Sequence, residues 1–131
     1  MIQRKQSVYL LLVLLFSAAL FYVPLFTDSS SGISTGIKSN TALILMNVAV
    51  GTIALISIFL FKNRNLQVRL SNLNILIICI LVGSVFYFSG QPTIHYEYGC
   101  YFPLAQLILT VLAIRSIKKD EELVRSADRL R

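Results

Sequence analysis

A histidine, a glutamate and a cysteine, which are residue types that can bind metal, lie close together in one short stretch. His95, the single histidine of the chain, is followed by Glu97 and Cys100 in the segment SGQPTIHYEYGC. A zinc site needs three or four protein ligands, usually supported by further hydrogen bonds, and this stretch offers a minimal set. A polar loop at a membrane surface accounts for the same residues, so we expect no metal and no cofactor.

Patterns that mark other kinds of catalysis are few in the sequence. It contains no His-Glu-x-x-His and no glycine-rich phosphate loop, and its Gly-x-Ser-x-Gly match at 32–36 lies in the Ser/Gly-rich loop 27–40. Outside residues 118–131 the acidic residues are Asp28 and Glu97, which fall in different loops and offer no carboxylate pair for hydrolysis. The sequence therefore predicts a protein that is not an enzyme. A membrane enzyme that uses His95 is the alternative.

Four long apolar runs separate these loops and indicate a membrane protein. The chain is 56% hydrophobic with a mean hydropathy of +0.73, and a helix needs about 20 apolar residues to cross about 30 Å of hydrocarbon. The third run is long enough only if its helix starts near residue 66, with Asn65 as the N-cap. The runs predict transmembrane helices at about 7–26, 41–62, 66–88 and 101–117.

The first apolar run has a second interpretation, a cleaved signal peptide. Its opening MIQRK resembles the positive start of a signal, and Ser17-Ala18-Ala19 resembles a cleavage site. The apolar sequence continues to Phe26, however, and a run of that length favours a membrane anchor.

Positive charge is distributed unevenly over the loops that four such helices create. With the N-terminus in the cytoplasm, eleven of the twelve basic residues lie on the cytoplasmic side and only Lys38 lies outside. Cytoplasmic loops of membrane proteins carry an excess of Lys and Arg. The sequence therefore predicts one membrane domain over residues 1–131, an all-α integral membrane bundle of four transmembrane helices with both termini in the cytoplasm (N-in/C-in).

The last fourteen residues, KKDEELVRSADRLR, are polar but nearly balanced in charge. They contain five basic and four acidic residues, whereas nucleic-acid binding needs many unopposed cations, so we expect no direct DNA binding. At 100° per residue the apolar side chains of this tail form one stripe, which predicts a cytoplasmic amphipathic helix over residues 120–130. We expect a bend at 118–120, where charged residues interrupt the stripe; a straight continuation of the fourth helix is the alternative.

Two elements form the predicted cytoplasmic interaction face, namely the basic loop before the third helix and the tail. The loop has no acidic residue nearby in sequence, so Asp120, Glu121 and Glu122 are its nearest natural partners. We expect the tail either to pack back over the start of the third helix or to dock on another protein. The residues of this face are Lys62, Arg64, Arg69, Leu123, Val124, Arg125, Ala127, Arg129 and Leu130.

Two large polar residues lie within the predicted spans. Asn47 and Gln106 are each about two turns from the outer face, where we expect them to hydrogen-bond each other between helices. The alternative is that they line, with Thr110, the polar path of a small oligomeric channel or transporter. The helix centres contain no charged residue, which argues against a proton or ion relay.

Three stretches carry a family resemblance: the opening MIQRKQSVYLLL, the segment FKNRNLQVRLSNLNIL and the ending AIRSIKKDEELVRSADRLR. Together they resemble, end to end, the bacterial family DUF4293. The resemblance implies a multi-pass four-helix protein of the bacterial cytoplasmic (inner) membrane. It implies no activity and no functional residues, because the family has none assigned.

These features predict a non-enzymatic accessory or assembly subunit of a larger membrane protein complex. Four short helices leave little interior for a substrate cavity, and the charged residues gather at the predicted cytoplasmic face. Membrane lipids and other membrane protein subunits are the expected partners. A protein-export or ribosome-associated machine is one candidate complex, because the inner loop is basic.

Overall fold

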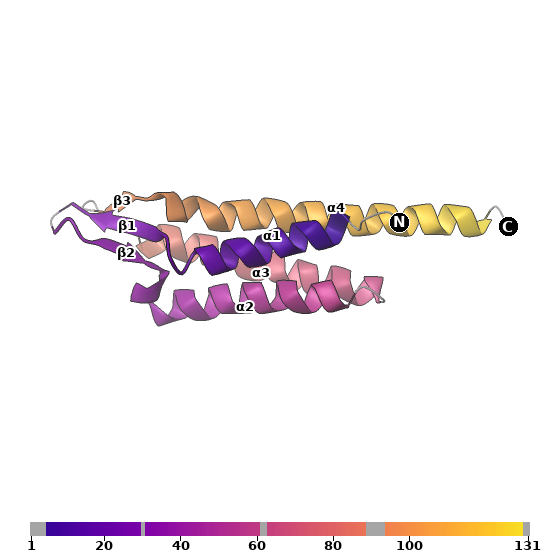
Figure 1. Ribbon diagram of the computed structural model, residues 1–131, viewed down its shortest axis with the longest axis horizontal. Helices are drawn as coiled ribbons and strands as arrows, with labels where there is room; N and C mark the ends of the chain where they lie inside the picture. The colour runs from indigo at the N-terminus through magenta and orange to yellow at the C-terminus, as the bar shows by residue number, and fades with distance from the viewer. Residues whose placement is uncertain (1–4, 30, 61–62, 89–93, 130–131) are drawn as a thin grey trace.

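Four helices form an elongated bundle in this structure, a computed structural model that describes residues 5–29, 31–60, 63–88 and 94–129 (Figure 1). The helices are α1 (Lys5–Ala19), α2 (Thr41–Phe59), α3 (Arg64–Phe88) and α4 (Tyr101–Arg129). Both α1 and α3 pack against α2 and against α4. The four helices therefore enclose one shared interior.

A three-stranded antiparallel sheet lies at one end of the bundle (Figure 1). The strands, in the spatial order β2-β1-β3, are β1 (Pro24–Asp28), β2 (Ser34–Gly36) and β3 (Ile94–Tyr96). Short 3-10 helices lead into α2 and α4; they are η1 (Ile37–Ser39) and η2 (Tyr98–Cys100). We name this end the sheet end, and we name the opposite end, where α1 and α3 begin and α2 ends, the tail end.

The sheet corrects the prediction of an all-α chain whose first helix covers 7–26. The helix α1 ends at Ala19, and Pro24 opens β1. Proline removes a backbone donor and disfavours the helical conformation of the residue before it, so it divides an apolar run that is long enough for one span. In β1, Phe26 lies opposite Thr35 on one side and opposite Tyr96 on the other. These partners are distant in sequence, and hydropathy alone does not indicate them.

The ends of α2 and α3 also differ from the predicted bounds. The helix α2 ends at Phe59, before the predicted residue 62, which lies outside the described residues. The predicted N-cap Asn65 lies instead in the first turn of α3, because the backbone carbonyl of Asn63 accepts hydrogen bonds from the amides of Leu66 and Gln67 at 3.1 and 3.0 Å. Asn63 therefore opens the helix.

The fourth helix and the tail form one continuous helix of 29 residues. The prediction of a bend at 118–120 and a separate tail helix is wrong. Residues 118–129 contain no Gly or Pro, and Arg125 forms an ion pair at 3.0 Å with Glu121, one turn earlier. As a result α4 continues past the ends of the other three helices at the tail end (Figure 1).

Three of the helices are long and apolar enough to cross a membrane. The qualifying segments are Thr41–Phe59, Arg64–Tyr87 and Tyr98–Ala127. The helix α1 is apolar but has 15 residues, or about 22 Å at 1.5 Å per residue. The length and composition of these helices are those of membrane-spanning segments.

The interior changes in character along the bundle. Its sheet end holds an apolar cluster formed by Leu20, Leu25, Phe26, Ile37, Leu43, Leu81, Val85 and Cys100. The middle holds a second apolar cluster formed by Val13, Val50, Ala54 and Ile78. Toward the tail end, four fully buried side chains are polar, namely Ser57, Gln67, Ser71 and Asn74.

Candidate functional site

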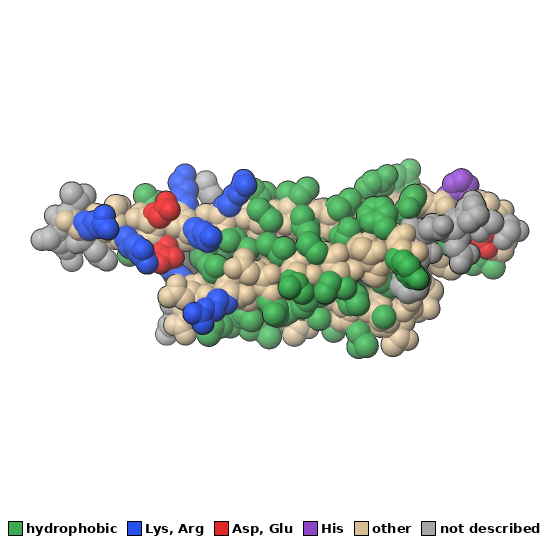
Figure 2. All heavy atoms as spheres, turned by 180° about the vertical axis from the view of Figure 1, so that it is seen from behind, with side chains coloured by type: hydrophobic (Ala, Val, Ile, Leu, Met, Phe, Trp, Pro, Cys, Tyr) green, Lys and Arg blue, Asp and Glu red, His purple; other side chains and the backbone are tan. Residues whose placement is uncertain are grey.

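Charged side chains gather over the tail end of the molecule, whereas hydrophobic side chains cover the middle (Figure 2). Lys5 begins α1 at this end, and the basic residues whose side chains the structure describes here lie on α3 and α4. They are Arg64, Arg69, Arg115, Lys118, Lys119, Arg125 and Arg129. Lys38 lies at the sheet end, with its Nζ 5.5 Å from the centre of the Tyr22 ring. The tail end is therefore the most highly charged part of the molecule's surface in this view.

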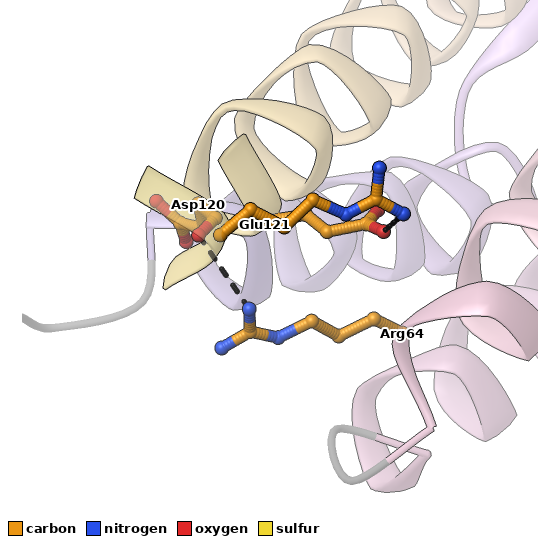
Figure 3. A network of polar contacts seen from close by, with 4 residues as sticks. Arg64, Asp120 and Glu121 are labelled. Carbon is orange, nitrogen blue, oxygen red and sulfur yellow. Dashed lines mark hydrogen bonds and ion pairs between the residues drawn. The ribbon is translucent and has the colours of Figure 1, made fainter. Parts of the chain in front are cut away.

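Arg64 links the start of α3 to α4 at this end. Its guanidinium Nη1 donates to the backbone carbonyl of Asp120 at 3.5 Å (Figure 3). The neighbouring Glu121 accepts from Arg125 of its own helix at 3.0 Å. The predicted contact between the basic loop and the acidic residues thus forms, but through the backbone of Asp120 instead of through a carboxylate.

An open groove of about 510 Å³ lies beside this contact. Its lining combines the first residues of α3 with one carboxylate from α4, and it consists of Asn63, Arg64, Asn65, Leu66, Arg69 and Glu121. Arg64 is half-buried and Arg69 is exposed. Two arginines from α3 therefore face a groove whose carboxylate, Glu121, is paired with Arg125.

The apolar stripe of the tail remains exposed. Leu123 is 58% exposed and Val124 is 46% exposed, and the side chains of Ala127 and Arg129 are also exposed. The expectation that the tail packs back over the start of α3 is therefore wrong, because α4 runs straight out of the bundle. Two residues of the predicted interaction face, Lys62 and Leu130, lie outside the described residues.

The predicted hydrogen bond between Asn47 and Gln106 does not form. Asn47 bonds instead with Ser17 of α1: its Nδ2 donates to the Ser17 carbonyl at 2.9 Å, and the Ser17 hydroxyl donates to the Asn47 carbonyl at 2.9 Å. Both groups are buried between α1 and α2, where a Cβ on Gly51 would lie 2.9 Å from the Ser17 hydroxyl oxygen. The small Gly51 thus permits the close approach that gives Asn47 a different partner.

Gln106 and Thr110 are fully buried on α4, but only one of them has a bonded side chain. The Thr110 hydroxyl donates to the backbone carbonyl of Gln106 at 2.7 Å. The carboxamide of Gln106 has no hydrogen-bond partner among the described residues. These two residues therefore do not continue the bonded pair of Ser17 and Asn47.

Three polar residues of α3 were not among the predicted functional residues. Gln67, Ser71 and Asn74 are fully buried, and with Ser57 of α2 they form a polar row inside the tail-end half of the bundle. Their spacing of four and then three residues places them on one helix face. That spacing is visible in the sequence. The neighbouring leucines at 66, 70 and 73 have the same period, however, so periodicity alone does not show which face of the helix is buried.

The three residues with metal-ligand chemistry do not converge on one site at the sheet end. His95 is exposed on β3, Glu97 accepts from the Thr27 hydroxyl at 2.8 Å, and the buried thiol of Cys100 donates to the Leu25 carbonyl at 2.9 Å. Within the described ranges, no group of three or more His, Cys, Asp or Glu is placed to hold a metal ion. The geometry therefore lends no support to an enzyme based on His95.

Comparison with known proteins adds one match. A family model described as Domain of unknown function (DUF4293) matches residues 2–130, which is nearly the whole chain. No curated protein and no solved structure matches.

Proposed function

Since this chain belongs to the DUF4293 family, whose function is unknown, we propose that it is a non-enzymatic accessory or assembly subunit of a larger membrane protein complex. The observation that supports this function best is the projecting end of α4, on which Leu123 and Val124 are largely exposed. Apolar side chains that share one face of a projecting helix are typical of an interaction site.

The proposal places the bundle across the bacterial inner membrane, with four spans and both termini in the cytoplasm. The basic residues at the tail end favour this orientation under the positive-inside rule. The helix α1 is the shortest span, but the backbone bonds of Leu20 to Phe16 and of Tyr22 to Ala19 add a further helical turn. Its bonds to Asn47 attach α1 to α2 within the proposed membrane region.

The direction of α4 argues that its end meets a protein and not the lipid surface. An amphipathic helix that binds lipid lies in the plane of the membrane. The end of α4 continues along the axis of the bundle (Figure 1), so in this placement it leaves the bilayer and enters the cytoplasm. Its basic and acidic residues are nearly equal in number, whereas anionic lipid attracts clusters of unopposed cations.

We commit to a partner helix from another subunit as the occupant of this site. Such a helix would cover Leu123, Val124 and Ala127 with its own apolar face and would meet both signs of charge beside them. Burying two large apolar side chains contributes about 3 kcal/mol, which is more than a hundredfold in affinity. A protein-export or ribosome-associated complex remains one candidate, because the adjacent groove carries Arg64 and Arg69.

Site-specific photo-crosslinking in cells tests the partner helix. A crosslinking amino acid in place of Leu123 should join the full-length chain to one membrane protein, at a peptide of amphipathic helical sequence. The matched control replaces Glu122, an exposed residue on the opposite face of α4, where we expect at least fivefold less product. Equal crosslinking at the two positions, or crosslinks to lipid alone, would contradict the proposal.

A second candidate, a small oligomeric channel or transporter, is favoured by the buried and unpartnered carboxamide of Gln106. Asn47 is less suited to line such a path, because Ser17 already bonds its side chain. Flux through proteoliposomes should fall with Gln106→Leu if this candidate is correct. Flux absent from the wild-type protein would remove it.

A further inference from the structure

The strongest feature outside the proposed docking site is the polar row formed by Ser57, Gln67, Ser71 and Asn74. All four side chains are fully buried. Six of their side-chain nitrogen and oxygen atoms have no hydrogen-bond partner among the described residues: Ser57 Oγ, Gln67 Nε2 and Oε1, Ser71 Oγ, and Asn74 Nδ2 and Oδ1. Buried polar groups almost always have a partner, so this cluster of exceptions needs an explanation.

The row runs from the tail end to the middle of the bundle. Ser57 is near the end of α2 and Gln67 is near the start of α3, so the antiparallel packing of these helices places both near the tail end. Asn74 lies ten residues into α3, or about 15 Å at 1.5 Å per residue. The polar row therefore reaches about halfway along the helix.

An apolar layer closes the row on its inner side. Ile78 is one turn beyond Asn74 on the same face of α3, and it packs with Val13, Val50 and Ala54. Beyond this layer, Leu81 and Val85 of α3 continue into the apolar cluster of the sheet end. The polar row is thus bounded by apolar side chains toward the sheet end, and its own side chains are fully buried.

The chemistry of the row indicates the kind of molecule that it binds. Two carboxamides and two hydroxyls supply donors and acceptors without a net charge. Such groups suit a small neutral molecule that both donates and accepts hydrogen bonds, and a buried ion would lack a compensating charge. Water is the smallest such molecule, and a buried water commonly makes about three hydrogen bonds to otherwise unsatisfied groups.

We propose that the tail-end half of the bundle interior is a hydrated chamber, in which water bound by Ser57, Gln67, Ser71 and Asn74 enters from the tail end and is stopped by the apolar layer at Ile78. The chamber is a one-sided water pathway into the bundle. This assignment rests on the interior of the bundle and is independent of the docking proposed for the exposed end of α4.

Nuclear magnetic resonance on the full-length protein in lipid nanodiscs tests the chamber with water itself. Cross-relaxation from water should reach the side-chain amides of Gln67 and Asn74. The matched control is Asn47, which is an equally buried carboxamide but is bonded to Ser17, and it should show no water contact. The absence of water contacts at both Gln67 and Asn74 would overturn the proposal.

A second experiment tests the one-sided closure. The native cysteines are first removed by Cys79→Ser and Cys100→Ser. Two single-cysteine variants, with Ser71→Cys or Ile78→Cys, are then treated with a small water-soluble thiosulfonate, which reacts with the thiolate form. We expect Ser71→Cys to react at least tenfold faster. Equal rates at the two positions would overturn the one-sided pathway, and so would a faster reaction at position 78.

Discussion

The two halves of the bundle differ in how many of their buried polar groups have hydrogen-bond partners. At the sheet end, the part-buried Thr27 hydroxyl bonds Glu97 and the buried Cys100 thiol bonds the Leu25 carbonyl, whereas the buried carboxamide of Gln106 near the start of α4 has no partner among the described residues. Toward the tail end, the row from Gln67 to Asn74 is buried without partners among the described residues. A buried polar group that lacks a partner costs about 1–3 kcal/mol. Among the described residues, the tail-end half thus buries more polar atoms without partners than the sheet-end half does.

The two ends of the molecule also differ in whether their contacts join distant or neighbouring residues of the chain. At the sheet end the sheet pairs segments that are distant in sequence, with Phe26 opposite Tyr96. At the tail end, the exposed part of α4 is supported mainly by local contacts, such as the ion pair of Glu121 with Arg125. Local contacts within one helix leave its other side chains free to contact a partner protein. In the sheet, pairing between distant segments already occupies the groups that could make such contacts.

Removing apolar volume from the sheet-end cluster should give the largest loss of stability. Leu81 is fully buried in that cluster, so Leu81→Ala should lower the free energy of unfolding by about 3 kcal/mol through lost burial and a residual cavity. On the same helix, Ser71→Ala in the polar row should cost less than about 1 kcal/mol. Unfolding by denaturing detergent measures both, and equal losses would break the comparison.

The junction of the sheet and α4 should be the next most sensitive position. A Cβ on Gly99 would collide with the backbone carbonyl of Pro24, so Gly99→Ala should destabilise by about 2 kcal/mol through overpacking. Gly83→Ala is the matched control, because beyond its chain neighbours and the backbone of its own helix nothing lies within 4 Å of the added Cβ. Thermal unfolding of the two variants measures the difference, and a destabilised Gly83→Ala with an unaffected Gly99→Ala would contradict it.

Replacing two buried asparagines should show how the stability cost differs between a hydrogen-bonded and an unbonded polar side chain. Asn47→Ala removes the hydrogen bonds to Ser17 and should cost about 1 kcal/mol. Asn74→Ala removes no bond to a described residue and should cost less than half as much. Detergent unfolding of the pair tests this order, and a reversed order would mean that Asn74 has a strong partner.

The smallest effect is expected on the exposed part of α4. Glu121→Gln removes the ion pair with Arg125 and should weaken the local helix by about 0.3 kcal/mol, with less effect in high salt. Hydrogen exchange of the amides after residue 121 measures this change. Protection that is unaltered at low salt would show that the pair does not support the extension.

Much of this architecture follows from local properties of the chain. Apolar runs of sufficient length predict the helices from 41, 66 and 101, and helices of the expected kind occur at Thr41–Phe59, Arg64–Phe88 and Tyr101–Arg129. The family resemblance is confirmed by the match over residues 2–130. Hydrophobic length and local motifs act over a few turns, so they can be recognised without knowledge of the fold.

Other features depend on contacts between distant segments. The first residues of β1, Pro24 to Phe26, continue the apolar run of α1, and pairing with β2 and β3 decides the conformation of the strand. Asn47 bonds Ser17 and not Gln106, because α1 approaches α2 closely at Gly51. Periodicity predicts neither the strand conformation of β1 nor the partner of Asn47, because each depends on which distant segment lies alongside.

The sequence by itself determined that the chain is an apolar, largely helical membrane protein with its charges concentrated toward one end, because hydropathy and charge are sums over residues. The tertiary structure decided which faces are inside. It buried Gln67, Ser71 and Asn74 and left Leu66 and Leu73 exposed. Lipid is as apolar as leucine, so outward-facing leucines carry no free-energy penalty in a membrane. The polar face of α3 then turns inward, and the packing of the four helices determines what surrounds it.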